Sequence, residues 1–378
     1  MKILFVSMPS VHVIRWIENL KDTSHELFWF DVLDRGRLDT LDSVTQVVNW
    51  KKRKVKYIKG EYFLSKKFPT LYEKMHPYLE VTANEALKRV LLDIKPDVVH
   101  SFEMQGCSYP IFKVMQECPN IKWLYSCWGN DLYYYQQFRI HLKKIKLVLS
   151  RVNYLHTDCK RDFELAKQLG FQGKHVGVIP GGTGYKLQDL EIYKLPLEDR
   201  KIILVKGYEH HLGRGLNIIM ALEALKNQIE NYEVVVFGAH TKVIDYINSH
   251  NLNFTVFDRH GLSHDELLKI MGKSLIYIGN SISDGMPNTL LEAIVMGIFP
   301  IQSNPGGVTG EIIENGKNGF LIQDAESVEE IKKRIMQTLT NFSIIEEAYK
   351  INSSISEWLL EYDFNKKKIH AIYHNLSK

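Results

Sequence analysis

The chain has 378 residues, of which 45% are hydrophobic and 24% are charged. This length exceeds one ordinary core, and the composition is that of a globular protein, so two domains are expected. The formal net charge is +4 with histidines counted as neutral, which is too small to indicate nucleic-acid binding by itself. No nucleic-acid recognition motif accompanies it, and we expect no such partner.

Four cysteines are present, Cys107, Cys118, Cys127 and Cys159, and their spacing matches neither a zinc site nor a CxxC motif. They are typical of reduced thiols in an intracellular protein. The first apolar run, within MKILFVSMPS, is shorter than the core of a signal peptide. No stretch reaches the roughly 20 apolar residues of a membrane span. We therefore predict a cytoplasmic protein that is not integral to a membrane.

In the first half, short apolar runs alternate with longer amphipathic segments. Strands are predicted at 2–7, 97–102, 122–128, 152–157 and 174–180, and helices at 11–20, 107–118, about 130–150 and 159–170. Residues 181–200 contain three glycines, one proline and mixed charge, which is typical of a linker.

The same rhythm resumes after this linker. Strands are predicted at 200–207, 232–239, 253–258, 274–280, 298–303 and 319–322, with helices at 213–227, 241–250, 263–273 and 287–297 and a mostly helical tail from 327. Strand–helix alternation predicts parallel sheets covered on both faces. The fold class is therefore α/β, with two doubly wound, Rossmann-like domains in tandem at 1–185 and 186–378. The final helices could pack on either domain.

One loop stands out, SISDGMPNTLLEAIVMG at 281–297, which joins a predicted strand to a predicted helix. Pro287 suits a helix start, and Gly285 allows a ligand to approach the backbone. The free N–H groups of the helix start can bind a phosphate or donate to hydroxyls. The Glu292 carboxylate can accept two hydrogen bonds side by side, as from the vicinal hydroxyls of ribose. Asp284 is placed to hold hydroxyls of a second ring.

Other interpretations of this loop remain open at this point. Asp284 could cap the helix, and Glu292 could be a solvated surface acid. A carboxylate pair of a glycoside hydrolase is a further alternative, although such an enzyme has no need of a phosphate-binding helix start. A metal site is not expected, because no histidine lies at ligand spacing.

The D-x7-E pattern of SDGMPNTLLEAIVMGIFPI resembles the E-x7-E signature of the retaining glycosyltransferases of family 4, which have the GT-B fold. Three further segments are similar to those of this family and occur in the expected order, at 94–100, 176–182 and 303–322. The resemblance covers most of the chain. The first acid is Asp rather than Glu, so its reach is one methylene shorter.

The resemblance implies roles for the residues of the second half. Glu292 would bind the ribose of a nucleotide-sugar donor, and Asp284 would hold the transferred sugar. Backbone N–H groups near the helix start would assist, those of Gly285, Met286 and Asn288, with Thr289 beside them. In LVKGYEHHLGRGL, Lys206 and Arg214 are the candidates for the donor diphosphate, although their order and spacing depart from the usual pattern.

For the acceptor side, the resemblance points to the ends of strands in the first half. Gly129 and Asp131 lie in YSCWGNDLYYY, which resembles a family segment that faces the cleft between the domains. His100 ends a predicted strand at the same edge and would touch the sugar, unless it is a satisfied structural histidine.

The implied reaction is transfer of a hexosyl or N-acetylhexosaminyl unit, favoured from a UDP-sugar, to an acceptor hydroxyl with retention at the anomeric carbon. No cofactor and no metal is expected, and the product would be a surface polysaccharide or glycolipid. The alternatives are a GT-B nucleotide-sugar epimerase, a sugar phosphorylase, and a non-catalytic protein that binds nucleotide sugars.

Two stretches of the first half are basic and aromatic. Residues 51–74 contain nine Lys and Arg against two Glu, interleaved with Tyr57, Tyr62, Phe63 and Phe68, and residues 132–151 contain five Lys and Arg and no acid. Such stretches suit an anionic membrane surface, which would place a peripheral enzyme near a lipid-linked acceptor on the inner face of the membrane. The alternative is a solvated basic face combined with core aromatics.

Overall fold

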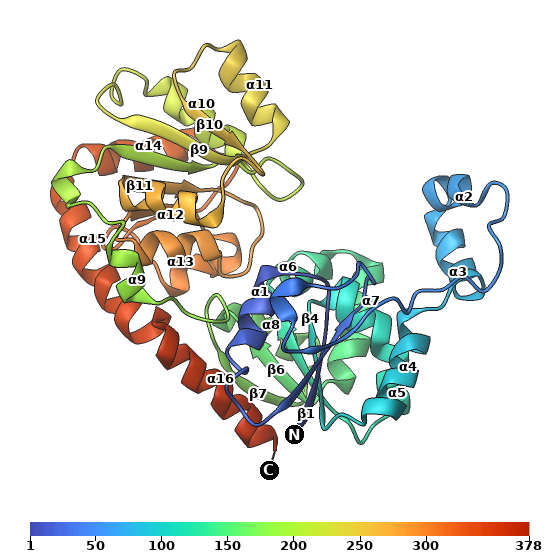
Figure 1. Cartoon of the computed structure of the whole chain (residues 1–378). Coiled ribbons are helices and arrows are strands. Elements are labelled where there is room, and N and C mark those ends of the chain that lie inside the picture. Colours follow the sequence, from blue (N-terminus) through green and yellow to red (C-terminus); the bar gives the residue numbers. More distant parts are fainter. Residues whose placement is uncertain (378) are drawn as a thin grey trace. The chain divides into compact units, whose positions relative to one another are not determined.

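The computed structural model describes residues 1–377, which form two compact units, each built on one sheet (Figure 1). The first unit comprises Met1–Thr157, Phe163–Gly177 and the chain from Ile369 onward. The second comprises Asp158–Asp162 and Val178–Lys368. The short segment 158–162 thus packs with residues that follow it by more than a hundred positions.

The first unit contains a seven-stranded sheet in the order β3-β2-β1-β4-β5-β6-β7. Its strands are β1 (Lys2–Ser7), β2 (Glu26–Asp31), β3 (Thr45–Val47), β4 (Val98–Phe102), β5 (Lys122–Cys127), β6 (Tyr154–Thr157) and β7 (Lys174–Val178). β1 pairs in parallel with both β2 and β4, so that Phe5 lies opposite Trp29 on one side and His100 on the other. The strand order reverses between β1 and β4, where ligands of such sheets bind.

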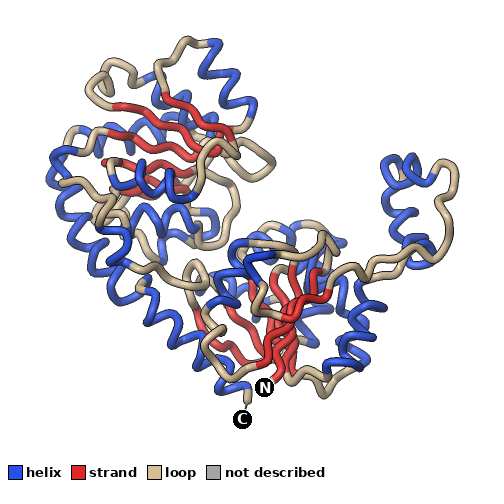
Figure 2. Tube along the Cα trace, viewed as in Figure 1, coloured by secondary structure: helices blue, strands red, loops and turns tan. Residues whose placement is uncertain are grey.

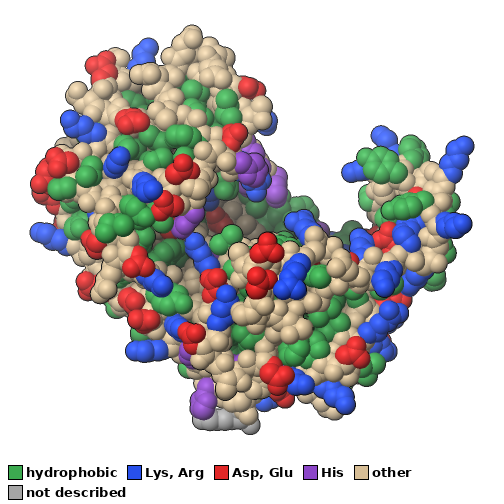
Figure 3. All heavy atoms as spheres, viewed as in Figure 1, with side chains coloured by type: hydrophobic (Ala, Val, Ile, Leu, Met, Phe, Trp, Pro, Cys, Tyr) green, Lys and Arg blue, Asp and Glu red, His purple; other side chains and the backbone are tan. Residues whose placement is uncertain are grey.

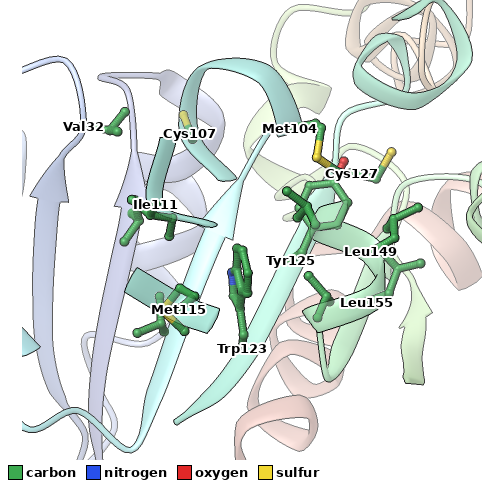
Figure 4. Packing of buried hydrophobic residues seen from close by; sticks show 14 of the residues in the cluster. Val32, Met104, Cys107, Ile111, Met115, Trp123, Tyr125, Cys127, Leu149 and Leu155 are labelled. Atoms are coloured by element: carbon green, nitrogen blue, oxygen red, sulfur yellow. The ribbon is translucent and has the colours of Figure 1, made fainter. Parts of the chain in front are cut away.

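Helices cover both faces of this sheet, whereas α2 and α3 project away from it (Figure 1 and Figure 2). The helices of the first unit are α1 (Val11–Glu18), α2 (Glu61–Lys67), α3 (Pro69–Leu79), α4 (Ala83–Ile94), α5 (Phe112–Glu117), α6 (Asn130–Tyr133), α7 (Arg139–Arg151) and α8 (Lys160–Gln168). In β5, Trp123 and Tyr125 point to the same face, where Met104 and Leu149 lie beside Tyr125 (Figure 4). Residues at alternate positions of a strand share a face, which is why these apolar side chains form one cluster.

The second unit contains a six-stranded sheet in the order β10-β9-β8-β11-β12-β13, and every pair is parallel. The strands are β8 (Ile202–Lys206), β9 (Glu233–Ala239), β10 (Thr255–Asp258), β11 (Ser274–Gly279), β12 (Phe299–Ser303) and β13 (Phe320–Ile322). The helices are α9 (Leu187–Glu191), α10 (Gly215–Ala224), α11 (Thr241–Ser249), α12 (His264–Gly272), α13 (Asn288–Val295), α14 (Val328–Leu339) and α15 (Phe342–Ile355). α16 (Tyr362–Leu376) begins in this unit, and its residues from Ile369 belong to the first. α10, α11 and α14 pack on one face, and α12 and α13 on the other.

The predicted pair of parallel sheets is confirmed, whereas β2, β3 and α2 to α4 were not predicted. Pro287 is the N-cap of α13 rather than its first residue. Among residues 1–377, no helix is long and apolar enough to cross a bilayer.

A chain of buried hydrogen bonds joins the end of α16 to the first sheet. The Trp16 indole donates to the Tyr373 hydroxyl at 2.8 Å, and this hydroxyl is hydrogen-bonded to His100 Nδ1 at 2.6 Å. The other ring nitrogen of His100 is hydrogen-bonded to Ser126 Oγ at 2.7 Å, and Ser126 Oγ is hydrogen-bonded to His156 Nδ1 at 3.0 Å. Burial holds the pKa of His100 well below its usual value and that of His156 at about 3, so both rings are neutral.

This arrangement predicts that Tyr373→Phe destabilises the first unit, although it retains the ring. The buried Trp16 N–H loses its acceptor, which costs roughly 1–3 kcal/mol in the free energy of unfolding. Urea denaturation measures this. The control is Tyr62→Phe, because the Tyr62 side chain is 76% exposed and loses only a solvated hydroxyl. Equal midpoints for both variants and the wild type would contradict the prediction.

Candidate functional site

Two loops meet where the strand order of the second sheet reverses, between β8 and β11. The loop after β8 runs beside the loop after β11: Ile282 N–H donates to Leu212 O at 2.9 Å, and Arg214 N–H donates to Asn280 O at 3.0 Å. Ligands of open parallel sheets bind at such a reversal, beyond the carboxyl ends of the strands. The predicted loop 281–287 therefore lies at the position where this fold binds ligands.

Lys206, the last residue of β8, and Asp284 form the charged centre of this site. Burial opposes the charge on Lys206, but Tyr277, Asp284, Tyr208 and Glu292 outweigh it and raise the lysine pKa above its usual value. For Asp284, burial raises the pKa, while the Lys206 ammonium and the Gly285 N–H, at 3.0 Å from Oδ1, oppose the rise. Lys206 and Asp284, two of the predicted residues, thus lie close enough for each charge to shift the pKa of the other.

Glu292 lies in the second turn of α13, where its side chain is 6% exposed. His264 at the start of α12 donates to it from Nε2 at 2.8 Å, and the His264 side chain is 47% exposed. The carboxylate is therefore held in position from one side by a partner that can swing into solvent. The Glu292 charge also helps to raise the pKa of Lys206. Lys206, Asp284 and Glu292 therefore interact electrostatically.

Arg214, a predicted contact of the donor diphosphate, lies directly before α10. Its Nε donates to Glu326 at 2.5 Å, and its Nη1 donates to the carbonyl oxygens of His210 and Gly213. The guanidinium therefore ties the loop after β8 to the segment that precedes α14.

A histidine that the sequence interpretation did not select, His210, lies in the same loop. Its Nδ1 accepts the N–H groups of Leu212 at 3.0 Å and Gly213 at 3.3 Å, so the ring proton resides on Nε2. Burial lowers the pKa of His210 to about 4, assisted by the positive charges of neighbouring histidines, Lys206 and Arg259. The ring is thus a neutral hydrogen-bond donor at neutral pH. The signal in the sequence was the insertion of two histidines between Lys206 and Arg214.

The segment 158–162 fixes the loop 284–286 through hydrogen bonds. Arg161 donates through Nη2 to the Asp284 carbonyl oxygen at 2.8 Å and through Nη1 to Pro305 O at 2.7 Å. Asp158 accepts the Met286 N–H at 3.1 Å. One of the backbone donors predicted to hold a sugar therefore has a carboxyl oxygen as its partner in this structure.

The segment 158–162 also contains donor atoms of Asp158, Cys159 and Asp162 within 4.8 Å of one another, which is a spacing that a metal ion could use. Arg161 already supplies positive charge there, through a 2.8 Å ion pair with Asp162. Burial raises the pKa of the Cys159 thiol, and the two carboxyl groups raise it further. A protonated thiol is a poor ligand, so these residues fit an arginine better than a metal.

In the first unit, the predicted residues lie deeper than expected. His100 is fully buried and both its ring nitrogens are bonded to protein groups, which is the environment of a structural histidine rather than of a residue at an open edge. Asp131 is 2% exposed and accepts from Tyr125, Cys127 and the Trp128 N–H. Gly129, at φ 87°, precedes α6 and is buried, so its backbone shapes this turn.

Glu103, directly after β4, was missed by the sequence interpretation. It has a positive φ of 64°, and its carboxyl oxygens accept the N–H groups of Gln105 and Gly106. Burial and the charge of Asp131 raise its pKa to about 7. An acid immediately after a buried strand at the β1–β4 reversal was the signal that could have identified it. A carboxyl group that titrates near neutrality is suited to exchange protons with a hydroxyl.

Comparison with known families adds to this geometry. Residues 2–158 match the model described as glycosyl transferase 4-like, and residues 188–353 match the model described as glycosyl transferases group 1. No curated protein matches the sequence.

Solved structures resemble the whole chain at low identity. Sucrose-phosphate synthase from Thermosynechococcus elongatus is 15% identical with a TM-score of 0.72, covering 100% of this chain and 99% of its own. A glycosyltransferase from Rickettsia africae is 16% identical with a TM-score of 0.66, covering 100% and 98%. HepE from Anabaena, in complex with UDP and glucose, is 16% identical with a TM-score of 0.67 and complete coverage of both chains. The likeness shows the fold, which is the predicted GT-B architecture.

The cluster around Arg161 predicts that Arg161→Met destabilises the second unit by roughly 3–5 kcal/mol, because the buried Asp162 carboxyl loses its partner. Urea denaturation measures the change. The matched control is the neighbouring Lys160→Met, since Lys160 is exposed. Adding Asp162→Asn to Arg161→Met should recover part of the loss, and an Arg161 variant as stable as the control would refute this role.

The pair Glu103 and Asp131 predicts a carboxyl group that titrates near pH 7 in the ¹³C NMR spectrum, and Asp131→Asn should move this pKa down because it removes a negative charge. The folded protein binds this proton more tightly than the unfolded chain, whose glutamate titrates near 4.5. Stability is therefore lost as pH rises from about 4.5 to 7, and Glu103→Gln should remove that loss. Glu117→Gln, on the exposed end of α5, is the control. An unchanged Glu103 titration in the Asp131 variant would contradict the prediction.

Proposed function

We propose that this chain, which belongs to the glycosyl transferases group 1, transfers a sugar from a UDP-sugar to a hydroxyl of a glycan or lipid-linked acceptor with retention at the anomeric carbon. The observation that carries the proposal is the grouping of Lys206, Asp284 and Glu292 where the second sheet reverses its strand order. The choice of UDP is supported by HepE of Anabaena, whose structures are complexes with UDP and with UDP-glucose.

The donor nucleotide would bind along the loop before α13. Glu292 is a buried acceptor held by His264, and the ribose hydroxyls would use its remaining lone pairs or displace this exposed histidine. The diphosphate would meet the Lys206 ammonium, the Nε2–H of His210 and the guanidinium of Arg214, whose present partner Glu326 has a side chain that is 58% exposed. Fixed donors of this kind stabilise a departing phosphate without rearranging.

The transferred sugar, a hexosyl or N-acetylhexosaminyl unit, would lie against Asp284 and the backbone donors of Gly285, Met286 and Asn288, with the Thr289 hydroxyl beside them. A sugar hydroxyl would replace Asp158 as the acceptor of the Met286 N–H. Arg161 would keep the loop in place during this exchange, since it grips the Asp284 carbonyl rather than the side chain.

In the reaction, the acceptor oxygen forms a bond to the anomeric carbon while the bond from that carbon to the diphosphate oxygen breaks. The electron pair of that bond goes to the diphosphate, whose charge Lys206 neutralises. The acceptor proton passes to a phosphate oxygen on the same face of the sugar, which accounts for retention. No step in this scheme needs a metal or a cofactor.

For the acceptor we propose the carboxyl edge of the first sheet, where Glu103 lies next to Asp131 and the turn at Gly129. The product would be a surface polysaccharide or glycolipid. The stretches 51–74 and 132–151 would hold the enzyme at the inner face of an anionic membrane, near a lipid-linked acceptor.

The proposal predicts that UDP raises the melting temperature of the wild type and that Glu292→Ala abolishes the rise. A ligand at about a hundred times its Kd stabilises the folded state by roughly 2.7 kcal/mol, which a thermal melt resolves. Glu292→Gln should retain part of the shift, because the amide oxygen still accepts one hydrogen bond. Glu346→Ala, an exposed acid on α15, is the control and should respond as the wild type does.

An equal shift in Glu292→Ala and the wild type would refute the ribose assignment. Absence of any shift with UDP, GDP and ADP in the wild type would refute the donor class. The anomeric configuration of the product, read from proton NMR, tests retention.

A further inference from the structure

We propose that the α2–α3 hairpin, residues 51–81 and hereafter the arm, docks the protein on an anionic lipid bilayer, with the aromatic side chains of α2 entering the interface between head groups and acyl chains. The inference rests on the proposed function for its purpose, because it names the surface on which a lipid-linked acceptor would be met.

The arm exposes an unusual concentration of large apolar side chains. Eight of the twenty that are exposed among residues 1–377 lie within positions 55–78. They are Val55, Tyr57, Ile58, Tyr62, Phe63, Phe68, Leu71 and Tyr78, with exposed fractions from 43% to 79%. The alternative that these aromatics form part of a core is therefore contradicted for Tyr57, Tyr62, Phe63 and Phe68. Contiguous apolar surface on this scale marks an interaction site.

The arm has almost no core of its own. The buried residue of α2 is Glu61, and that of α3 is Leu79. Helices of seven and eleven residues are marginal by themselves in water. Their apolar faces require another surface in order to contribute to stability.

The exposed charge of the arm is positive. Its three acids are Glu61, Glu73 and Glu80, and each is ion-paired. In the part of the chain that the structure describes, six lysines of the arm form no ion pair: Lys52, Lys56, Lys59, Lys66, Lys67 and Lys74. Figure 3 shows Lys and Arg side chains beside hydrophobic ones over α2 and α3. Aromatic residues mixed with lysine are the composition of surfaces that lie in a membrane interface.

The base of the arm is fixed by Arg53. Its guanidinium holds both oxygens of Glu61, at 2.6 and 2.8 Å, and Glu80 at 3.0 Å. Two backbone hydrogen bonds close the neck, from Lys54 to Leu79 O and from Val81 to Lys52 O. Lys51, Arg53 and Lys54 thus serve as structural ties. The lysines without an ion pair lie on the two helices and in the segment that precedes α2. A fixed neck presents the apolar face without the entropy cost of ordering it on binding.

The face continues onto α7. The ion pair between Glu73 and Lys144, at 3.3 Å, joins the two elements. α7 exposes Phe138, Ile140 and Leu147. A groove of about 380 Å³ on the same helix is lined by Arg139, Leu142, Lys143, Lys146 and Leu147. Both basic stretches therefore contribute to one surface of the first unit.

An anionic bilayer fits this surface better than a second copy of the chain. Two copies meeting through the arm would bring like charges together, because every acid of the arm is already paired. A lipid surface with negative head groups attracts each exposed lysine and takes up the aromatic rings as well.

The test is sedimentation of the full chain with vesicles of phosphatidylcholine mixed with phosphatidylglycerol, compared with phosphatidylcholine alone. The wild type should pellet with the anionic vesicles and release in high salt. The charge variant is Lys59→Gln, Lys66→Gln, Lys67→Gln, expected to weaken binding roughly fivefold per lysine. The apolar variant is Tyr62→Ser, Phe63→Ser, Phe68→Ser, expected to release at lower salt.

Matched controls change equally exposed residues of the second unit, Lys226→Gln, Lys242→Gln, Lys333→Gln for charge and Ile192→Ser, Trp358→Ser for apolar surface. They should pellet as the wild type does. Equal pelleting of the arm variants and the controls would overturn the inference. A wild type that ignores vesicles and sediments as a dimer, with monomeric arm variants, would also overturn it and assign the arm to a second copy.

The UDP-induced rise in melting temperature is measured on the same variants. Arm variants should retain it, which shows that they are folded and bind the donor. If the wild type binds UDP but its arm variants pellet unchanged, the lipid inference fails alone. If the wild type shows no shift with any nucleotide, the proposed function fails, whatever the vesicles show.

Discussion

A parallel sheet that is covered on both faces leaves one place for polar groups, the loops that follow its strands. In both units the important polar residues lie there, at the point where strand order reverses. Lys206 is the last residue of β8, Asp284 follows β11, and Glu103 follows β4. Because these loops are partly withdrawn from water, each charge needs a specific partner. In the second unit this partner is supplied by charge pairing, because the Lys206 ammonium is stabilised by the carboxyl groups of Asp284 and Glu292.

The same requirement explains the segment 158–162. Asp158 and Asp162 place two acids in the interior of the second unit. Arg161 forms an ion pair with Asp162 and also donates a hydrogen bond to the Asp284 carbonyl oxygen. A structural ion pair thus sets the position of the loop that carries the proposed sugar contacts. Removing the arginine would affect folding and binding through one interaction, which is why stability and nucleotide binding have to be measured separately.

Local patterns in the sequence were sufficient to predict the strand, loop and helix that carry Asp284 and Glu292, and they were insufficient for contacts between distant segments. Asp284 and Glu292 were found because a strand, a glycine and a helix start lie within seventeen residues of sequence. The partner of Arg214 is Glu326, 112 positions away, and that of His100 is Tyr373, 273 positions away. No periodicity or spacing encodes contacts of such separation. His100 looked like the end of an open strand because nothing in its neighbourhood announces that a tyrosine of the last helix covers it.

For the arm, the sequence showed a basic and aromatic composition but did not decide between a membrane-facing surface and a core. Aromatic residues between lysines suit a core that is flanked by charge and equally a surface that meets lipid. The two interpretations differ only in whether the rings are buried, and the exposed fractions of Tyr57, Tyr62 and Phe63, from 59% to 79%, decide against the core. Arg53 joins the two ends of the hairpin through its ion pairs with Glu61 and Glu80. The apolar faces of the two helices take no part in these contacts and stay exposed. The arm is therefore fixed at its base, and the exposed apolar side chains of its helices are available to contact a surface outside the chain.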